Sequence, residues 1–253
     1  MRLKKNPVKN LHKLLILYFF LWIILFEFIL PVNNILPKPS VVLLSFSALW
    51  NDYKLPVNFL STVGAIYISL ALAYIIVWSI KVYLIKSNHF ISDFLLSLHW
   101  FSNFIPWIIL GIFLIYWLPS SEYIKYIFVF LISFFFIIVH LKQELRNVKK
   151  EYIESAISLG ADEKTISKKI IWKSMQPQLF NHLITLHFQL WSLAIIFEFI
   201  SGGYGIGSIY RRALEYKDLS AIFTMTIITG ITIYLGSLLI KYLKNKFYHW
   251  SFT

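Results

Sequence analysis

The chain has 253 residues, of which 58% are hydrophobic and only 14% are charged. A water-soluble domain of this length cannot bury so much apolar surface, so the composition is typical of a polytopic membrane protein. The formal net charge of +12 could suggest nucleic acid. The basic residues flank apolar runs instead of forming one stripe with interleaved aromatic residues, so we expect no nucleic-acid partner. Since the chain has no cysteine, disulfides, thiol nucleophiles and thiolate metal sites are excluded.

Six apolar segments are each close to the roughly 20 residues that a helix needs to cross a bilayer. They are predicted at residues 14–30, 57–80, 94–118, 123–141, 179–200 and 219–242. The first follows basic residues, as a secretory signal does, but Pro31-Val-Asn-Asn after it is not a cleavage site, which predicts an uncleaved span. No repeat or low-complexity linker divides the chain. The sequence therefore predicts an all-α membrane protein with six transmembrane helices and a single domain over residues 1–253.

The basic residues predict the orientation of these spans. With six spans both termini lie on one side of the membrane, and 18 of the 24 Lys and Arg residues fall on that side. Such an excess is typical of the cytoplasmic face. Both termini and the segment 142–178 are therefore predicted to be cytoplasmic. Segments 32–56, 118–122 and 201–218 would lie outside, and in the first of them Ser40 is expected to cap a short helix over residues 41–50.

The segment 142–178 has the pattern of a short helix, a hinge and a second helix. Ile153, Ala156 and Ile157 share one face at helical spacing. Gly160 follows where a helix end favours a left-handed residue. Asp162 then lies where the next helix, over residues 163–176, would take its N-cap. By itself this pattern also fits an interfacial helix pair whose lysines reach the lipid headgroups.

The spacing Glu154-x-Ala156-x-x-x-Gly160, followed by Ile170 and Pro177, resembles the cytoplasmic loop of the membrane subunits of bacterial ABC importers. That loop carries a Glu-Ala-Ala...Gly motif and forms a coupling helix that docks on a separate ATPase subunit. This chain departs from the motif at Ser155, and Trp172-Lys173 stands where the family usually has Leu-Pro. The resemblance implies that the contact with the ATPase is made by Glu154, Ser155, Ala156, Leu159, Gly160, Ala161 and Asp162.

Two further landmarks are similar to one subgroup of these importers, which carries sulfonates, taurine, nitrate or thiamine precursors. The segment Leu36-Pro-Lys-Pro-Ser40 resembles the Leu-Pro-x-Pro segment that follows the first span of that subgroup. Glu198, together with Gly205-Ile-Gly207, resembles its acidic residue and Gly-Leu-Gly loop near the outer end of span five. The resemblance makes Glu198, Gly205 and Gly207 candidates for the translocation path or its gate.

The resemblance also implies an assembly in the bacterial inner membrane. A second permease copy, most simply a homodimer, would pair with this chain, together with two cytoplasmic ABC ATPases and an extracytoplasmic solute-binding protein. The chain has no Gly-x4-Gly-Lys-Ser/Thr phosphate-binding motif. We therefore expect no cofactor in this chain, ATP and magnesium in the partner ATPase, and a non-catalytic transport role here.

Other functions remain as alternatives. A self-sufficient secondary transporter usually carries internal repeats and charged pairs within its spans, and the sequence suggests neither. An intramembrane enzyme would need converging acidic or metal-ligating residues, but His140, His182 and His187 form no His-Glu-x-x-His pattern. The run Gly202-Gly-Tyr-Gly-Ile-Gly207 invites a nucleotide-binding interpretation, but it lies between two spans and follows no strand, so we expect a tight turn.

Overall fold

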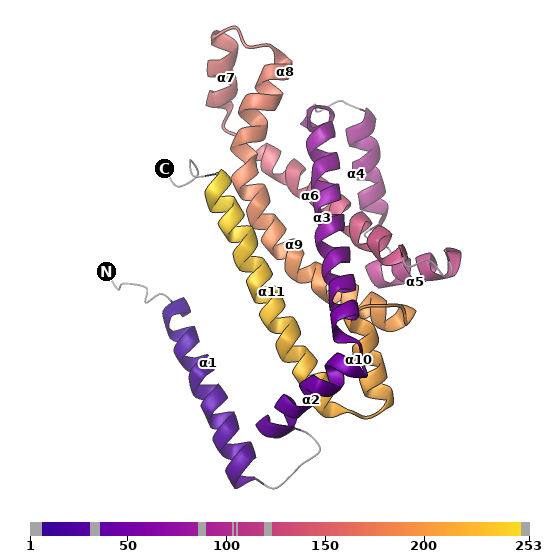
Figure 1. The fold of residues 1–253 in the computed structure, drawn as a ribbon. Coiled ribbons are helices and arrows are strands. Elements are labelled where there is room, and N and C mark those ends of the chain that lie inside the picture. Colours follow the sequence, from indigo (N-terminus) through magenta and orange to yellow (C-terminus); the bar gives the residue numbers. More distant parts are fainter. Residues whose placement is uncertain are drawn as a thin grey trace. The chain divides into compact units, whose positions relative to one another are not determined.

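The computed structural model describes residues 7–30, 36–85, 90–102, 104, 106–118 and 123–248. Within these residues every regular element is helical, which confirms the all-α class (Figure 1). The elements are α1 (Pro7–Ile23), η1 (Ile24–Ile29), α2 (Pro39–Asn51), α3 (Leu55–Ile85), α4 (Phe90–Ser102), α5 (Trp107–Trp117), α6 (Ile124–Arg146), α7 (Lys150–Ser158), α8 (Glu163–Thr165), η2 (Ile166–Ile171), α9 (Trp172–Ser201), α10 (Ile206–Glu215) and α11 (Leu219–Phe247). The segments η1 and η2 are short π-helical stretches.

In the described part of the chain, four helices are long and apolar enough to cross a membrane: α3, α6, α11 and the continuous helix Glu163–Ser201. Shorter apolar helices cover Ile16–Ile29, Pro39–Asn51 and Trp107–Trp117. Helices of this kind establish a membrane-embedded protein, because an apolar helix of about 20 residues matches the hydrocarbon thickness. The count of six spans and the cytoplasmic termini stay predictions. The residues around Pro31, on which the uncleaved first span depends, lie outside the described part of the chain.

The predicted span 94–118 is not one continuous helix. It is divided between α4 and α5, with Pro106 in an extended conformation (φ −56°, ψ 135°) as the N-cap of α5. Proline has no backbone N–H and disfavours helical geometry in the residue before it. The apolar composition of the segment concealed this break.

Conversely, two elements that were predicted to be separate form one helix. α8, η2 and α9 run without interruption from Glu163 to Ser201, through Pro177. A proline inside a helix removes one backbone hydrogen bond, but buried leucines such as Leu179 and Leu183 continue the packed face beyond it. The helix that follows the Gly160 hinge is therefore the extension of a helix long and apolar enough to span the membrane.

Contacts group the chain into two compact units, and the prediction of a single domain stays a prediction. The first unit contains residues 1–56 and 209–229. Within it Ser45 hydrogen-bonds Thr224 (2.5 Å) and Leu49 is fully buried. The expected cap at Ser40 is wrong: α2 begins at Pro39, and the Ser40 backbone N–H donates to the Glu27 carboxylate (3.1 Å). Proline suits the first turn of a helix because its missing N–H would have no partner there.

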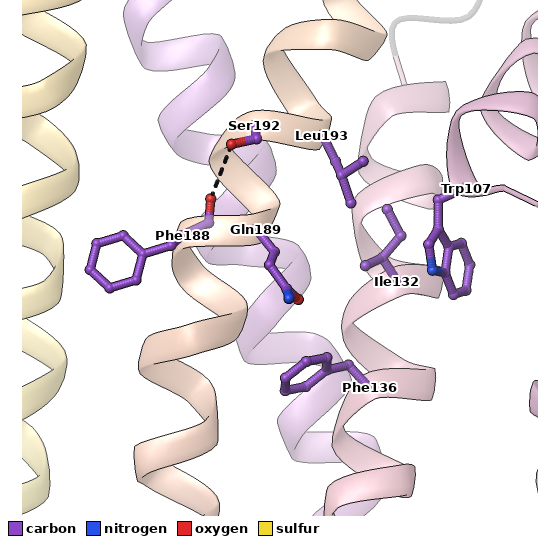
Figure 2. Close-up of a pocket in the computed structure, with 7 residues that line it drawn as sticks. All are labelled: Trp107, Ile132, Phe136, Phe188, Gln189, Ser192 and Leu193. Atoms are coloured by element: carbon purple, nitrogen blue, oxygen red, sulfur yellow. Dashed lines mark hydrogen bonds between the residues drawn. The ribbon is translucent and has the colours of Figure 1, made fainter. Parts of the chain in front are cut away.

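The second unit contains residues 57–208 and 230–253. Its core lies where α6 packs along α9, with the rings of Phe128 and Phe197 stacked at 4.7 Å and Trp191 fully buried. A cavity of about 570 Å³ lies beside this contact, lined by residues of α5, α6 and α9 (Figure 2). At one end of the unit α7 folds back beside the start of the long helix (Figure 1).

Candidate functional site

The turn at Gly160 is a helix end closed by a left-handed glycine. Gly160 has φ +78°. Its N–H donates to the carbonyl of Ile157 (2.9 Å), while the N–H of Ala161 donates to the carbonyl of Ala156 (3.0 Å). This pair of bonds is the Schellman motif, which favours glycine because other L-residues are strained at positive φ. The predicted hinge is confirmed.

The turn exposes most of the residues predicted to contact an ATPase. Leu159 is 88% exposed, and Glu154, Ser155, Gly160 and Asp162 are exposed as well. Ala161 is partly exposed, and Ala156 is buried and holds α7 in place. A side-chain carbon added at Gly160 would meet no atom within 4 Å. Leucine side chains normally avoid water, so an apolar tip beside an open glycine forms a protruding surface that a partner could cover.

The hairpin around the turn is packed from within. Ile166 and Ile171 of η2 are buried, and together with Ile153 and Ile157 of α7 they line a hollow of about 410 Å³. Asp162 is the N-cap residue of α8, as predicted: its carbonyl accepts from the N–H of Ile166 (3.0 Å), while its side chain makes no capping bond. The exposed tip therefore stands on an apolar base that continues into α9.

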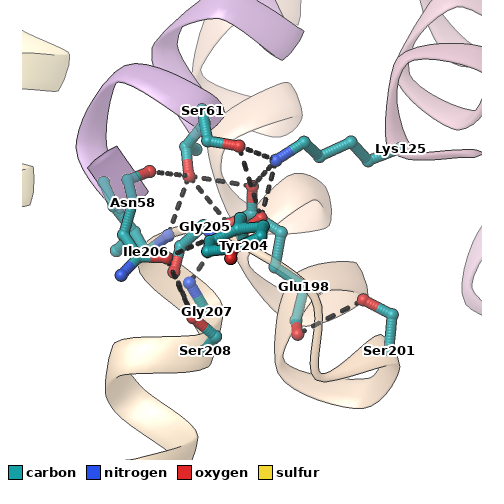
Figure 3. A network of polar contacts seen from close by, with 11 residues as sticks. Asn58, Ser61, Lys125, Glu198, Ser201, Tyr204, Gly205, Ile206, Gly207 and Ser208 are labelled. Atoms are coloured by element: carbon teal, nitrogen blue, oxygen red, sulfur yellow. Dashed lines mark hydrogen bonds and ion pairs between the residues drawn. The ribbon is translucent and has the colours of Figure 1, made fainter. Parts of the chain in front are cut away.

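The second predicted site is a buried polar network around Glu198 (Figure 3). The Glu198 side chain is 1% exposed near the end of α9. Its carboxylate accepts hydrogen bonds from the Thr62 hydroxyl (2.8 Å) and the Gly207 backbone N–H (3.1 Å). The Lys125 ammonium lies 3.7 Å from it. A carboxylate in a low-dielectric interior needs such partners, because an unpaired charge there is costly.

The same network holds the turn that joins α9 to α10. Lys125 also donates to the carbonyl of Tyr204 (2.6 Å) and to the Ser61 hydroxyl. The Asn58 side-chain carbonyl accepts from the Gly205 N–H (2.8 Å) and from the Ser208 hydroxyl (3.2 Å). Side chains of α3, α6 and α9 therefore hold this turn in place by hydrogen bonds to its backbone.

Two glycines, Gly205 in this turn and Gly207 at the start of α10, are required by close packing. Gly205 has φ +149°, and a side chain there would overlap the Glu198 carboxyl group. A side chain at Gly207 would overlap the backbone of α9 at Ile195 and Phe199. The structure thus brings Glu198, Gly205 and Gly207 together. Their part in a path or gate stays a prediction.

Sequence reasoning missed the partners of Glu198. Asn58 and Thr62 are polar residues inside an apolar run, four apart and therefore on one helix face, which was a usable signal. Lys125 lies at the start of the predicted span 123–141, and no partner was predicted for it. The expectation that the spans hold no charged pair is wrong, since Lys125 and Glu198 form one between α6 and α9.

The histidines also lie in packed positions. His187 is fully buried, and its Nε2 accepts from the Trp191 indole N–H (2.9 Å) and lies 2.9 Å from the Tyr67 hydroxyl. His182 lies 2.9 Å from the Glu144 carboxylate, with the His140 ring 4.2 Å away. Within the described residues no group of three His, Asp or Glu is placed to hold a metal ion.

In the first unit, the segment after α10 carries a second polar cluster. Asp218 accepts from the backbone N–H of Ala221 (3.0 Å) and the Ser220 hydroxyl (2.7 Å), which makes it the N-cap of α11. The Tyr53 hydroxyl donates to its other oxygen (3.1 Å). Partial burial would raise the pKa of Asp218, but these hydrogen bonds outweigh it and the pKa is lowered. The pKa of Tyr53 is raised to about 12, first by burial and then by the Asp218 charge.

Comparison with known families agrees with this architecture. A family model described as "binding-protein-dependent transport system inner membrane component" matches residues 75–248. The matched range includes the Gly160 hairpin, Lys125, Glu198 and the turn that joins α9 to α10. A search of curated proteins gives no significant match.

Proposed function

Because the chain belongs to the family of inner-membrane components of binding-protein-dependent transport systems, we propose that it couples ATP hydrolysis in a partner subunit to solute import through the hairpin at Gly160. Permeases of this family work with ABC ATPases and solute-binding proteins. In this proposal a second copy completes the translocation path, and the assembly lies in the bacterial inner membrane. ATP and magnesium are bound by the partner, and this chain performs no covalent chemistry.

The observation that supports the proposal best is the exposed tip of the hairpin. Leu159 projects beside a glycine whose surroundings are empty, and the helix that follows continues without a break into α9. A rigid helix transmits a displacement of one end to the other. Movement of the docked ATPase would therefore shift α9 directly, without a flexible linker between the contact and the span.

We further propose that the solute belongs to the class carried by the sulfonate, taurine, nitrate and thiamine-precursor importers. The order of Leu36-Pro-Lys-Pro-Ser40, the Gly160 hairpin and the Glu198 turn along the chain supports this subgroup. Selectivity in such systems lies mainly in the binding protein. Measuring which of these solutes the partner binding protein retains tests the assignment.

The coupling proposal is tested by Gly160→Asp. The substitution adds a side chain and a charge at the proposed contact, while aspartate, like asparagine, is among the residues tolerated in the left-handed conformation. We expect normal membrane insertion, because the packing of the spans is unaffected. The ATPase should co-purify in reduced amount and uptake should be lost.

Gly160→Asn is the matched control, because asparagine tolerates the left-handed conformation and adds no charge. It should retain more ATPase than the aspartate variant. Near-normal uptake and full ATPase retention in Gly160→Asp would refute the coupling role. The hairpin would then be interpreted as an interfacial helix pair.

A further inference from the structure

One exposed face of α9 is polar between Ser174 and Ser192. Its members are Ser174, Gln178, Asn181, Thr185, Gln189 and Ser192, here called the α9 polar stripe. From each member to the next the chain advances by three or four residues, which keeps all of them on one side of the helix. The four members inside the predicted span 179–200, from Asn181 to Ser192, cover about 16 Å of helix axis, roughly half of the hydrocarbon thickness.

The opposite face of the helix is apolar and already occupied. Leu179, Leu183, Leu186 and Leu190 are buried, and α9 packs along α6 within the same unit. The helix is therefore amphipathic in the sense of a water-soluble protein, with leucine inside and polar groups outside. A span that faced lipid on its exposed side would have the reverse pattern.

Other spans of the same unit show that reverse pattern. On α3 the side chains of Leu72 and Ile75 are 49% and 54% exposed, and on α11 those of Leu235 and Leu239 are 57% and 52% exposed. Apolar residues at such positions suit contact with hydrocarbon. Between Ser174 and Ser192, α9 presents mainly amides and hydroxyls, with Phe188 (46% exposed) beside them. Lipid cannot hydrogen-bond such polar groups.

In the part of the chain that the structure describes, four members of the stripe have an internal hydrogen bond and two do not; the Ser174 hydroxyl donates to the Ile171 carbonyl (2.8 Å). Asn181 bonds Gln178 (2.8 Å) and Lys244 (2.9 Å), and the Ser192 hydroxyl reaches the Phe188 carbonyl (3.5 Å). Within the described residues, the side chains of Thr185 and Gln189 have no hydrogen-bond partner. Gln189 lines the cavity of about 570 Å³ and points into it, beside Ile132 and Phe136 of α6 (Figure 2).

We infer that the α9 polar stripe forms a wall of the water-filled path and offers a passing solute uncharged amide and hydroxyl groups. This inference rests on the proposed function and adds the lining of the path to it. From Gln178 to Ser192 the stripe has no charged member. Neutral hydrogen-bonding groups suit a polar solute that must enter and leave without being held by a fixed charge.

The absence of cysteine permits a direct test. Single cysteines are placed at Thr185, Gln189 and Ser192, and at the apolar controls Ile75 and Leu239, in the assembled permease–ATPase complex in membrane vesicles. The probe is a cationic methanethiosulfonate, which reacts with thiolates, and a thiol ionises in water but not in hydrocarbon. We expect the stripe positions to react at least about tenfold faster than the controls.

Equal, slow rates at stripe and control positions would overturn the inference. The inference would also be overturned if stripe cysteines did not react with the probe but cross-linked two copies of the chain on oxidation. That result would identify the stripe as part of a dry interface between the copies. ATPase co-purification is measured on the same samples. A parent chain that retains no ATPase would defeat the proposed function, whereas unreactive stripe positions in a complex with full ATPase would defeat only this inference.

Discussion

At the scale of single residues, the environment of Glu198 shows how a charge is kept inside an apolar unit. The carboxylate is surrounded by Thr62, Lys125 and the N–H of Gly207. Each of these groups comes from a different part of the chain. Removing any one of these partners should therefore destabilise the protein by more than the single contact that is lost.

Lys125→Met should destabilise the protein strongly, because it leaves the Glu198 carboxylate buried without its cation. Breaking a buried pair on one side costs about 3–5 kcal/mol. Adding Glu198→Gln to the same chain should recover much of that loss, since a neutral amide can still accept from Thr62. Thermal unfolding of the detergent-solubilised protein measures both variants. If Lys125→Met were as stable as the parent, the ion pair between Lys125 and Glu198 would contribute nothing to the stability of the protein.

Two glycines between the end of α9 and the start of α10 allow a matched comparison. Gly207→Ala, in the first turn of α10, forces overlap with the α9 backbone, and overpacking of this kind costs about 1–3 kcal/mol or more. Gly203 lies in the turn before α10, and a side-chain carbon added there, as in Gly203→Ala, would have the Ser201 hydroxyl as its nearest atom, at 3.8 Å. We expect a clear loss of thermal stability in the first variant and almost none in the second. Equal melting temperatures would contradict the packing described here.

At the scale of elements, the ends of the helices are set by local chemistry that can be tested separately. Asp218 caps α11 through the backbone N–H of Ala221. Asp218→Ala should reduce stability by about 1 kcal/mol, as loss of an N-cap usually does. Asp218→Asn keeps a side-chain acceptor and should retain most of the cap. Melting temperatures at neutral pH distinguish the two.

The cap also predicts a pH dependence. Because the folded-state pKa of Asp218 is lowered from its ordinary value of 3.8, its ionised form stabilises the folded state above that pH. This stability is lost as the pH falls through the lower folded-state pKa. The Asp218→Asn variant has no carboxylate at this position and therefore lacks this contribution at every pH. The difference in melting temperature between the parent and Asp218→Asn should therefore be constant above about pH 4 and should narrow below it. A difference that is constant down to pH 2 would exclude the titration of Asp218.

At the scale of the whole molecule, the distribution of basic residues predicts which side of the membrane the hairpin occupies. In the Cys-free chain, Glu163→Cys should be protected from a membrane-impermeant thiol reagent added to intact cells, and Tyr204→Cys should be labelled. Both side chains are exposed, so protection reports the side of the membrane rather than burial. The reverse labelling pattern would overturn the orientation and the coupling role together.

Sequence alone was sufficient for the features that depend on local or average properties. The apolar fraction indicated the membrane class, and the all-α fold followed from it. Gly160 could be predicted as a left-handed helix end because the conformational preference of glycine acts within one turn of the chain. The long apolar runs concealed the break at Pro106, and helix α10 was missed, although Ile206, Ile209 and Ala213 had the spacing of one buried helix face.

Only the tertiary structure decided which polar groups meet. Lys125 and Glu198 are 73 residues apart along the chain, and Thr62 lies farther still from its carboxylate partner. No local pattern encodes such pairings, because they depend on how α3, α6 and α9 pack side by side. The same holds for the α9 polar stripe: its spacing is visible in the sequence, but its exposure follows from the packing that buries the leucines of α9. Local backbone preferences and average hydrophobicity act over a few residues, whereas the partners of a buried charge are chosen by helix packing.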